Sequence, residues 1–318
     1  MIIVYVVVIC ALFYALGMVA DRVIAHIREV ARRLGVSVFF LGLFLGIFTS
    51  LAELSIGIGA LMRNTQALTV GNLLGGIVVL MGFILGLGLV FNRTINTDGH
   101  IKTIVPYLVF ILLLFILGSD KTLSRTDGVI MLVAYVALLG MMYYHHRVAR
   151  ARDRADEKDT FKPETRYKTI LVVTRLLGWL VLAFMIAQGI VELAMRILPQ
   201  LGLSAFVVGI VVFSIGTNLP ELMVTIRSWR RHITSLSLST ILGSAMANVM
   251  IAGLFALARP IDIITDDSFV LLAIVASILG LFFLVFYKTG RVLTRREGVV
   301  LLIIYALFLA VQITLIQQ

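Results

Sequence analysis

Two glutamates stand inside long apolar runs of this 318-residue chain. Glu53 ends the segment 49–53, which has the sequence TSLAE, and Glu221 ends the segment 217–221, which has the sequence TNLPE. The other acidic residues fall outside the middle of the apolar runs. A carboxylate at membrane depth costs at least about 2.5–3.5 kcal/mol, so it usually marks an ion or proton path. These two segments are therefore the predicted functional centre.

Hydroxyl and amide groups accompany both acids. Thr49 and Ser50 precede Glu53 by four and three residues, so the three side chains share one face of a helix. Such hydroxyls often bond back to helix carbonyls, but beside a buried carboxylate we favour their interpretation as ligands. Thr217 and Asn218 adjoin the second acid in the same way.

Three further polar side chains lie in the apolar runs that follow the acids. Ser244 and Asn248 are four residues apart, on a common helix face that could meet Glu221. Asn72 lies in a glycine-rich run, where small residues let helices pack closely. In this position Asn72 could equally well form an interhelical hydrogen bond or belong to the site.

The predicted site offers oxygen ligands, which hard cations require. Calcium takes about 6–8 oxygens, and sodium also accepts oxygen-only sites. Soft metals call for thiolate or imidazole, and neither occurs near the two glutamates. Two carboxylates match a divalent charge, and protons can compete for the empty site because two facing like charges cannot readily both persist. The constellation therefore predicts transported ions, Ca²⁺ against Na⁺ or H⁺, and no cofactor.

The composition is that of a polytopic membrane protein. Hydrophobic residues make up 60% of the chain, against about 45–50% in soluble domains, and they form long runs. The lone cysteine, Cys10, excludes an internal disulfide. A cleaved signal peptide is the alternative for residues 1–20. It lacks a charged beginning, and Asp21 and Arg22 follow in place of a small-residue cleavage site, so we favour a retained span.

The apolar runs predict an all-α fold of ten transmembrane helices. When the loops alternate between the two sides, 21 of the 27 basic residues fall on one side, which the positive-inside rule makes cytoplasmic. Both termini are then extracytoplasmic, and a plasma membrane fits the compact loops. The net charge of +10 is explained by topology rather than by nucleic-acid binding. The predicted spans are 2–19, 36–62, 68–91, 101–117, 128–144, 169–191, 204–226, 233–257, 268–287 and 299–316.

An internal duplication relates the two halves of the chain. A shift of 168 positions superimposes residues 49–75 on 217–243, including both acids and a glycine 22 residues after each. Because each half has five spans, the halves enter the membrane in opposite senses, which places their shared site near the midplane. Pro220 would break its helix there and expose carbonyls to an ion. The expected units are a first repeat at 1–145, a basic cytoplasmic linker at 146–168 and an inverted second repeat at 169–318.

At these segments the sequence resembles the calcium/cation antiporter superfamily, which includes sodium/calcium exchangers. Residues 216–222, GTNLPEL, are similar to its G-T-S-L-P-E-L motif, and residues 71–75, GNLLG, to its G-N-x-x-G motif. The resemblance covers both halves and implies alternating access around a midplane site lined by the second, third, seventh and eighth spans. The ligands that it implies are Thr49, Ser50, Glu53, Thr217, Asn218, Glu221, Ser244 and Asn248.

The chain departs from these motifs mainly in its first half. Ala52 stands in place of the motif proline, and Asn218 in place of the usual serine. Gly76 and Leu80 replace a serine and an asparagine of the longer G-N-x-x-G-S-N-x-x-N pattern, which removes two oxygen ligands from the third span. Both glutamates remain, so a central divalent site is still expected, whereas a full set of separate sodium sites is not.

The leading hypothesis is a secondary antiporter in a lipid bilayer, whose partners are inorganic cations. It is not predicted to be an enzyme, because no Ser/His/Asp or zinc-ligand arrangement occurs within the spans. The alternatives are a degenerate, non-transporting cation-binding protein or sensor, and a passive channel, although nothing resembles a selectivity-filter loop. The oligomeric state is left open by the sequence.

Overall fold

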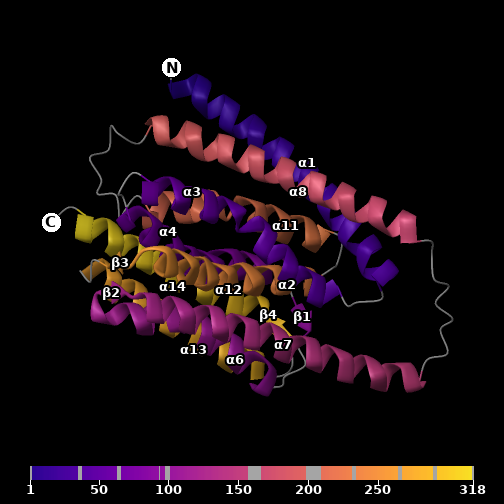
Figure 1. Ribbon diagram of the computed structural model, residues 1–318. Helices are drawn as coiled ribbons and strands as arrows, with labels where there is room; N and C mark the ends of the chain where they lie inside the picture. The colour runs from indigo at the N-terminus through magenta and orange to yellow at the C-terminus, as the bar shows by residue number, and fades with distance from the viewer. Residues whose placement is uncertain are drawn as a thin grey trace.

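The computed structural model describes residues 2–34, 38–62, 66–92, 94–96, 101–156, 166–197, 209–230, 234–263, 267–288 and 292–316. These residues form helices joined by short strands (Figure 1). In the first half the elements are α1 (Ile2–Leu34), α2 (Val38–Thr49), α3 (Leu51–Met62), α4 (Gln66–Val78), η1 (Val79–Ile84), α5 (Leu85–Asn92), β1 (Thr94–Asn96), α6 (Ile101–Leu117), η2 (Gly118–Asp120), β2 (Thr122–Leu123) and α7 (Arg125–Asp156). In the second half they are α8 (Arg166–Ile197), η4 (Gly209–Phe213), α10 (Ser214–Thr217), α11 (Leu219–Arg230), α12 (Thr234–Ala258), β3 (Ile261–Asp262), α13 (Asp267–Lys288), β4 (Val292–Thr294) and α14 (Arg295–Ile316).

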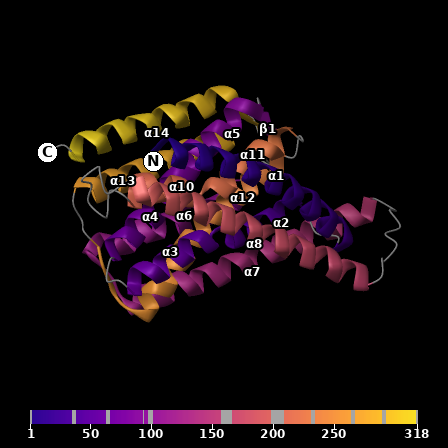
Figure 2. The ribbon, with the colours of Figure 1, turned by 90° about the horizontal axis from the view of Figure 1, so that it is seen from above.

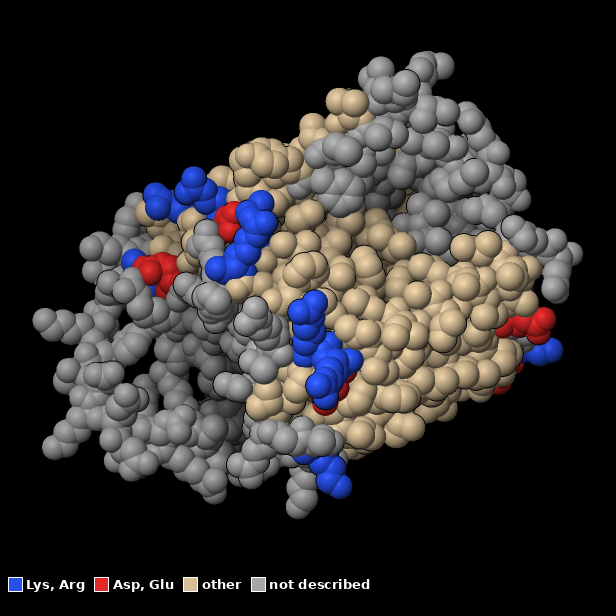
Figure 3. Space-filling view, turned by 180° about the vertical axis from the view of Figure 1, so that it is seen from behind, with Lys and Arg blue, Asp and Glu red and all other residues tan. Residues whose placement is uncertain are grey.

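Several helices are long and apolar enough to cross a membrane. Within the described residues there are five, over Gln66–Phe91, Arg125–Met142, Leu236–Ala258, Asp267–Lys288 and Arg295–Leu315, and Ile104–Asp120 and Ile170–Ile186 form shorter apolar helices. Their outward side chains are apolar, as lipid requires, with Val133, Leu281 and Leu307 at least 60% exposed. An uncharged expanse of surface separates the charged side chains at its two ends (Figure 3).

Helix α12 forms the centre of the bundle and packs along α2, with α4, α6, α7 and α11 around it (Figures 1 and 2). Its residues 236–249 are all buried. A second layer is made by α14, which packs on α5, and by α13. Helices α1 and α8 run together along the outside of the bundle, where Leu16 and Ile24 of α1 meet Leu219 and Val224 of α11 in a separate apolar cluster.

Two short antiparallel sheets join the two halves of the chain at opposite ends of the bundle (Figure 1). Strand β1 pairs with β4, with Thr94 opposite Thr294, and strand β2 pairs with β3, with Thr122 opposite Asp262. A turn at Lys121, whose φ is 77°, positions β2, and Ile263 N donates to Lys121 O at 2.8 Å. Each sheet therefore takes one strand from each half.

The helices extend further than the predicted spans at three places. Helix α1 continues to Leu34. Its buried face holds Val23, Ile24, Ile27 and Val30, which recur at helical spacing in the sequence. Helix α7 continues to Asp156 and α8 begins at Arg166, inside the expected linker; residues 157–165 lie outside the described residues. Alanine and arginine, abundant in 148–154, favour helix, so the helix does not stop where the apolar run ends.

Candidate functional site

Both acid-bearing segments interrupt their helices at equivalent positions. The interruption between α2 and α3 lies at Ser50, and that between α10 and α11 lies at Asn218, 168 residues later. Each acid thus falls in the first turn of a new helix, Glu53 in α3 and Glu221 in α11. The partial positive charge at a helix N-terminus favours a carboxylate there.

Proline chemistry accounts for the second interruption. Pro220 has no N–H, so the carbonyl of Gly216 loses its helical donor, and the N–H of Asn218 turns to that carbonyl instead. The Asn218 side chain then donates from Nδ2 to Ser214 O at 2.7 Å, in place of the backbone donor. The proline of the motif therefore breaks the helix as predicted, and Asn218 repairs the break.

The first interruption has a different cause, because Ala52 occupies the proline position. The carbonyl of Gly46 keeps its helical hydrogen bond from Ser50 N at 3.1 Å, and two hydroxyls crowd it, Thr49 Oγ1 at 3.0 Å and Ser244 Oγ of α12 at 3.3 Å. Hydroxyls that insert into the backbone ladder bend helices. Here a tertiary contact supplies one of them.

Glycines bring the backbones of the site helices together. A Cβ on Gly243 of α12 would lie 2.8 Å from the Cα of Leu43, and a Cβ on Gly46 would lie 2.7 Å from the Cα of Gly243. On the other side of the bundle, a Cβ on Gly75 of α4 would lie 2.9 Å from the Cα of Ile210. Small residues at such crossings let helices approach to backbone contact.

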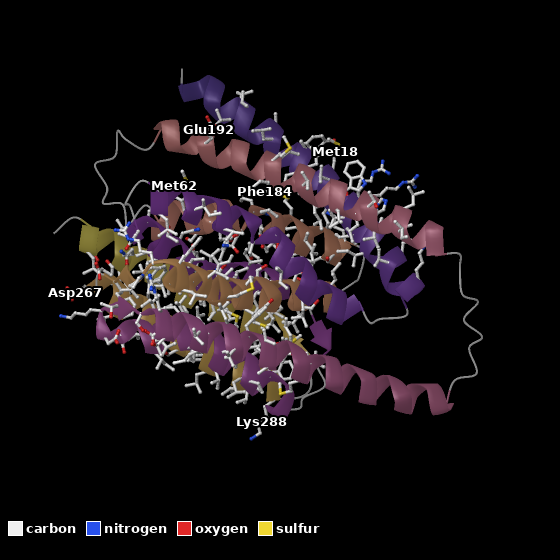
Figure 4. All side chains as sticks on the ribbon, viewed as in Figure 1. Met18, Met62, Phe184, Glu192, Asp267 and Lys288 are labelled. Atoms are coloured by element: carbon white, nitrogen blue, oxygen red, sulfur yellow. The ribbon has the colours of Figure 1, made fainter. Side chains whose placement is uncertain are left out.

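Glu53 and Glu221 converge in the bundle interior. Both are fully buried, and they are close enough for their carboxylates to interact electrostatically. The neighbouring hydroxyls are crossed, since Thr217 lies near Glu53 and Thr49 lies near Glu221. Figure 4 shows the labelled Glu192, Asp267 and Lys288 at the periphery instead.

Helix α12 contributes Ser244 to this centre and carries Asn248 one turn further along the same face. Ser244 Oγ donates to Glu221 Oε1 at 2.8 Å and lies 3.3 Å from Thr49 Oγ1. Asn248 Nδ2 donates to Leu73 O at 3.3 Å, which ties α12 to α4.

Asn72 connects α4 to the broken helix of the second half. Its Oδ1 accepts a hydrogen bond from Thr217 Oγ1 at 3.3 Å, and Thr217 also lies 2.9 Å from Phe213 O. This contact joins α4 to α10 and also places the amide oxygen of Asn72 beside a predicted ligand, so both of its predicted roles stay open.

Several buried oxygens of the site have no hydrogen-bond partner among the described residues. They are Glu53 Oε1 and Oε2, Glu221 Oε2, Ser50 Oγ, Asn218 Oδ1 and Asn248 Oδ1. Buried polar atoms without partners are rare in folded proteins and call for an explanation such as a bound ion. These six atoms come from carboxylates, amides and a hydroxyl, the ligand types that hard cations take.

Sequence reasoning missed two features of the helices that line the site. One is the carbonyl of Gly46, which the motif comparison leaves unmarked although it accepts hydrogen bonds from two site hydroxyls. The other is the pair Thr69 and Ser237, which are buried, lack partners among the described residues and are related by the 168-residue shift. Their equivalence under the shift was a usable signal.

Comparison with known proteins gives relatives over nearly the whole chain. The chain is 26% identical over 305 residues to an uncharacterized membrane protein of Methanocaldococcus jannaschii, covering 94% of this chain and 96% of that one. It is 26% identical over 329 residues to the sodium/calcium exchanger MaX1 of Methanosarcina acetivorans, covering 92% and 93%. The fold matches a solved structure of the sodium-calcium exchanger NCX_Mj with a TM-score of 0.79 at 22% identity, over 98% of this chain and 99% of that one. Since the sodium/calcium exchanger protein family matches residues 4–144 and 169–314, the chain belongs to that family of membrane transporters.

Proposed function

We propose that the protein is a secondary antiporter that exchanges Ca²⁺, or another hard divalent cation, for Na⁺ or H⁺. Membership of the exchanger family supports cation antiport, and MaX1 and NCX_Mj are named as sodium/calcium exchangers. The observation that carries the proposal is the pair of fully buried carboxylates, Glu53 and Glu221, accompanied by buried oxygens that have no hydrogen-bond partner in the described part of the chain. Two negative charges in a low-dielectric interior persist only with compensating cations or protons.

Inverted repeats would let one site open alternately to the two sides. The 168-residue shift that carries Glu53 to Glu221 also carries Thr94 of β1 to Asp262 of β3. It carries β2 to residues 290–291, next to β4. Because β1 pairs with β4 and β2 with β3, at opposite ends of the bundle, the pairing is what a two-fold axis in the membrane plane predicts.

The glycine crossings follow the same symmetry. Gly243 packs against Leu43 and Gly46 of α2, while Gly75, its equivalent, packs against Ile210 and Ser214. This symmetry supports a site between the two halves, as alternating access requires. We extend the proposal to ten spans in a plasma membrane with both termini extracytoplasmic.

Gradient-driven flux in proteoliposomes tests the exchange. An outward Na⁺ or H⁺ gradient should drive Ca²⁺ uptake, and uptake should stop when that gradient is dissipated. Tight Ca²⁺ binding without flux would indicate a sensor instead. Ca²⁺ uptake that needs no counter-gradient would indicate a channel. Either result would overturn the proposal.

Ser50 provides a test of the ligand assignment. Its hydroxyl is fully buried and has no hydrogen-bond partner among the described residues, so Ser50→Ala leaves no partner unsatisfied. If the hydroxyl contacts the ion, its loss should cost about 1.5 kcal/mol, or roughly tenfold in the Ca²⁺ concentration for half-maximal flux. Thermal stability in detergent should stay the same.

The matched control is Ser277→Ala on α13, where the hydroxyl is exposed and donates to Ala273 O at 2.7 Å. This variant should have the Ca²⁺ dependence of the wild type. An unchanged half-maximal concentration in Ser50→Ala would remove Ser50 from the ligand set.

A further inference from the structure

The charge of the site is fixed by two side chains. Among the described residues, Glu53 and Glu221 are the only charged side chains that are fully buried, and no group of three or more His, Cys, Asp or Glu side chains gathers elsewhere. No arginine or lysine lies among these buried residues. The site therefore carries at most two negative charges.

A net charge inside an occluded site is costly. Moving an uncompensated ion from water into protein costs several kcal/mol even after relaxation. With two carboxylates, a neutral occluded state holds one divalent cation or two monovalent cations. One divalent cation together with a monovalent cation, or three monovalent cations, would leave an uncompensated positive charge.

A further cation beside Gly76 would need oxygen ligands, and among the described residues the structure provides none at that position. A Cβ on Gly76 would lie 2.6 Å from Asn248 Nδ2 and 3.2 Å from Asn218 Nδ2, so two amide groups fill this space with their nitrogens. Both nitrogens donate to backbone carbonyls, those of Leu73 and Ser214. Amide N–H groups repel a cation.

One turn further along the same face, Leu80 is fully buried in the apolar core. At Gly76 and Leu80 the site therefore meets carbon and the N–H groups of Asn218 and Asn248 rather than oxygen. The unpartnered amide oxygens, Asn218 Oδ1 and Asn248 Oδ1, belong to the same two side chains whose nitrogens face Gly76. The oxygens therefore remain for one central ion.

From the charge count and the orientation of these amides, we infer that the exchange is electroneutral, with one divalent cation moving against two monovalent cations or two protons per cycle. The inference rests on the proposed antiport and specifies its stoichiometry. Two positive charges cross in each direction, so no net charge moves. The membrane potential then does no work on the cycle.

The experiment measures the gradients at which net flux stops in proteoliposomes clamped at different potentials with K⁺ and valinomycin. For electroneutral exchange, the balancing Ca²⁺ ratio should equal the square of the Na⁺ or H⁺ ratio and should not change with potential. If one net charge moved per cycle, 100 mV would shift the balancing ratio by roughly 40-fold. A shift of that size would overturn the stoichiometry while leaving the antiport intact. Absence of gradient-driven flux with both Na⁺ and H⁺ would overturn the antiport and, with it, this inference.

A charge-adding variant tests the same argument from the other side. Asn248→Asp keeps the shape of the side chain and loses the hydrogen bond from Asn248 Nδ2 to Leu73 O, which is 3.3 Å long. Asn248 is chosen rather than Asn218 because the hydrogen bond from Asn218 Nδ2 to Ser214 O is shorter, at 2.7 Å. A third carboxylate would compensate a third positive charge, so the balance point should become dependent on potential. If Asn248→Asp transports Ca²⁺ and its balancing Ca²⁺ ratio is still independent of membrane potential, the charge count does not set the stoichiometry. If this variant does not fold, the potential dependence measured for the wild-type protein is sufficient to test the proposal.

Discussion

Replacing Glu221 by glutamine should abolish gradient-driven Ca²⁺ flux. The amide keeps the shape of the side chain. Its oxygen can still accept the hydrogen bond that Ser244 Oγ donates to Glu221 Oε1 at 2.8 Å in the native protein. It removes one of the two charges that compensate a divalent ion. A carboxylate about 4 Å from a divalent cation contributes on the order of 8 kcal/mol at an effective dielectric constant of about 20, so divalent affinity should fall by more than about 1,000-fold. Flux assays and Ca²⁺ binding in detergent measure both effects.

The control for this substitution is a glutamate outside the bundle interior. Glu192 lies exposed on α8, at the periphery in Figure 4, and Glu192→Gln should transport like the wild type. Glu53→Gln should reproduce the loss expected for Glu221→Gln, because the proposed exchange has both carboxylates bind the same ion. Flux within about twofold of wild type in a well-folded Glu221→Gln protein would remove this carboxylate from the site.

The second large effect is expected for Gly243→Ala, a single added methyl group. The new carbon would lie 2.8 Å from the Cα and 3.0 Å from the carbonyl carbon of Leu43, and backbone atoms cannot move aside as the end of a side chain can. Helices α2 and α12 would have to separate. Overpacking of this kind typically costs about 1–3 kcal/mol of folding free energy. We expect a lower midpoint of thermal unfolding in detergent, together with lost Ca²⁺ affinity because Ser244 follows in the same turn.

Gly140→Ala is the matched control and should change stability in the opposite direction. Gly140 lies exposed on α7, and no atom lies within 4 Å of its added Cβ. In a helix, alanine is more stable than glycine by about 0.5–1 kcal/mol. Equal stabilisation by the two substitutions would contradict the backbone contact between α2 and α12.

Much of this molecule is determined by local physics that the sequence displays directly. An acid in an apolar run is conspicuous because its insertion penalty must be offset by a function. Helical periodicity places Thr49, Ser50 and Glu53 on one face, and it predicts the buried face of α1. Pro220 predicts a helix break because proline lacks the N–H that the helix needs. These inferences depend on neighbours within a few residues.

Helix boundaries, and hydrogen bonds that no sequence motif marks, are harder to predict from the sequence. The charged segment after residue 145 is polar enough to resemble a linker, yet α7 continues to Asp156 because helix propensity there does not depend on apolar residues. The helix break at Ser50 has no proline to announce it. At this break the hydroxyls of Thr49 and Ser244 lie beside the carbonyl of Gly46, and Ser244 is almost 200 residues away.

The sequence by itself determined the membrane class, the two acids, their accompanying oxygens and the duplication, because each depends on composition, spacing or self-similarity along the chain. Only the tertiary structure decided which oxygens of the described residues remain without partners. It also decided that the threonines cross to the opposite glutamate, and that two amide nitrogens fill the space beside Gly76. These arrangements follow from backbone contact at Gly46, Gly75 and Gly243 between helices far apart in the chain, and pattern within a single helix cannot fix how its polar groups meet those of another.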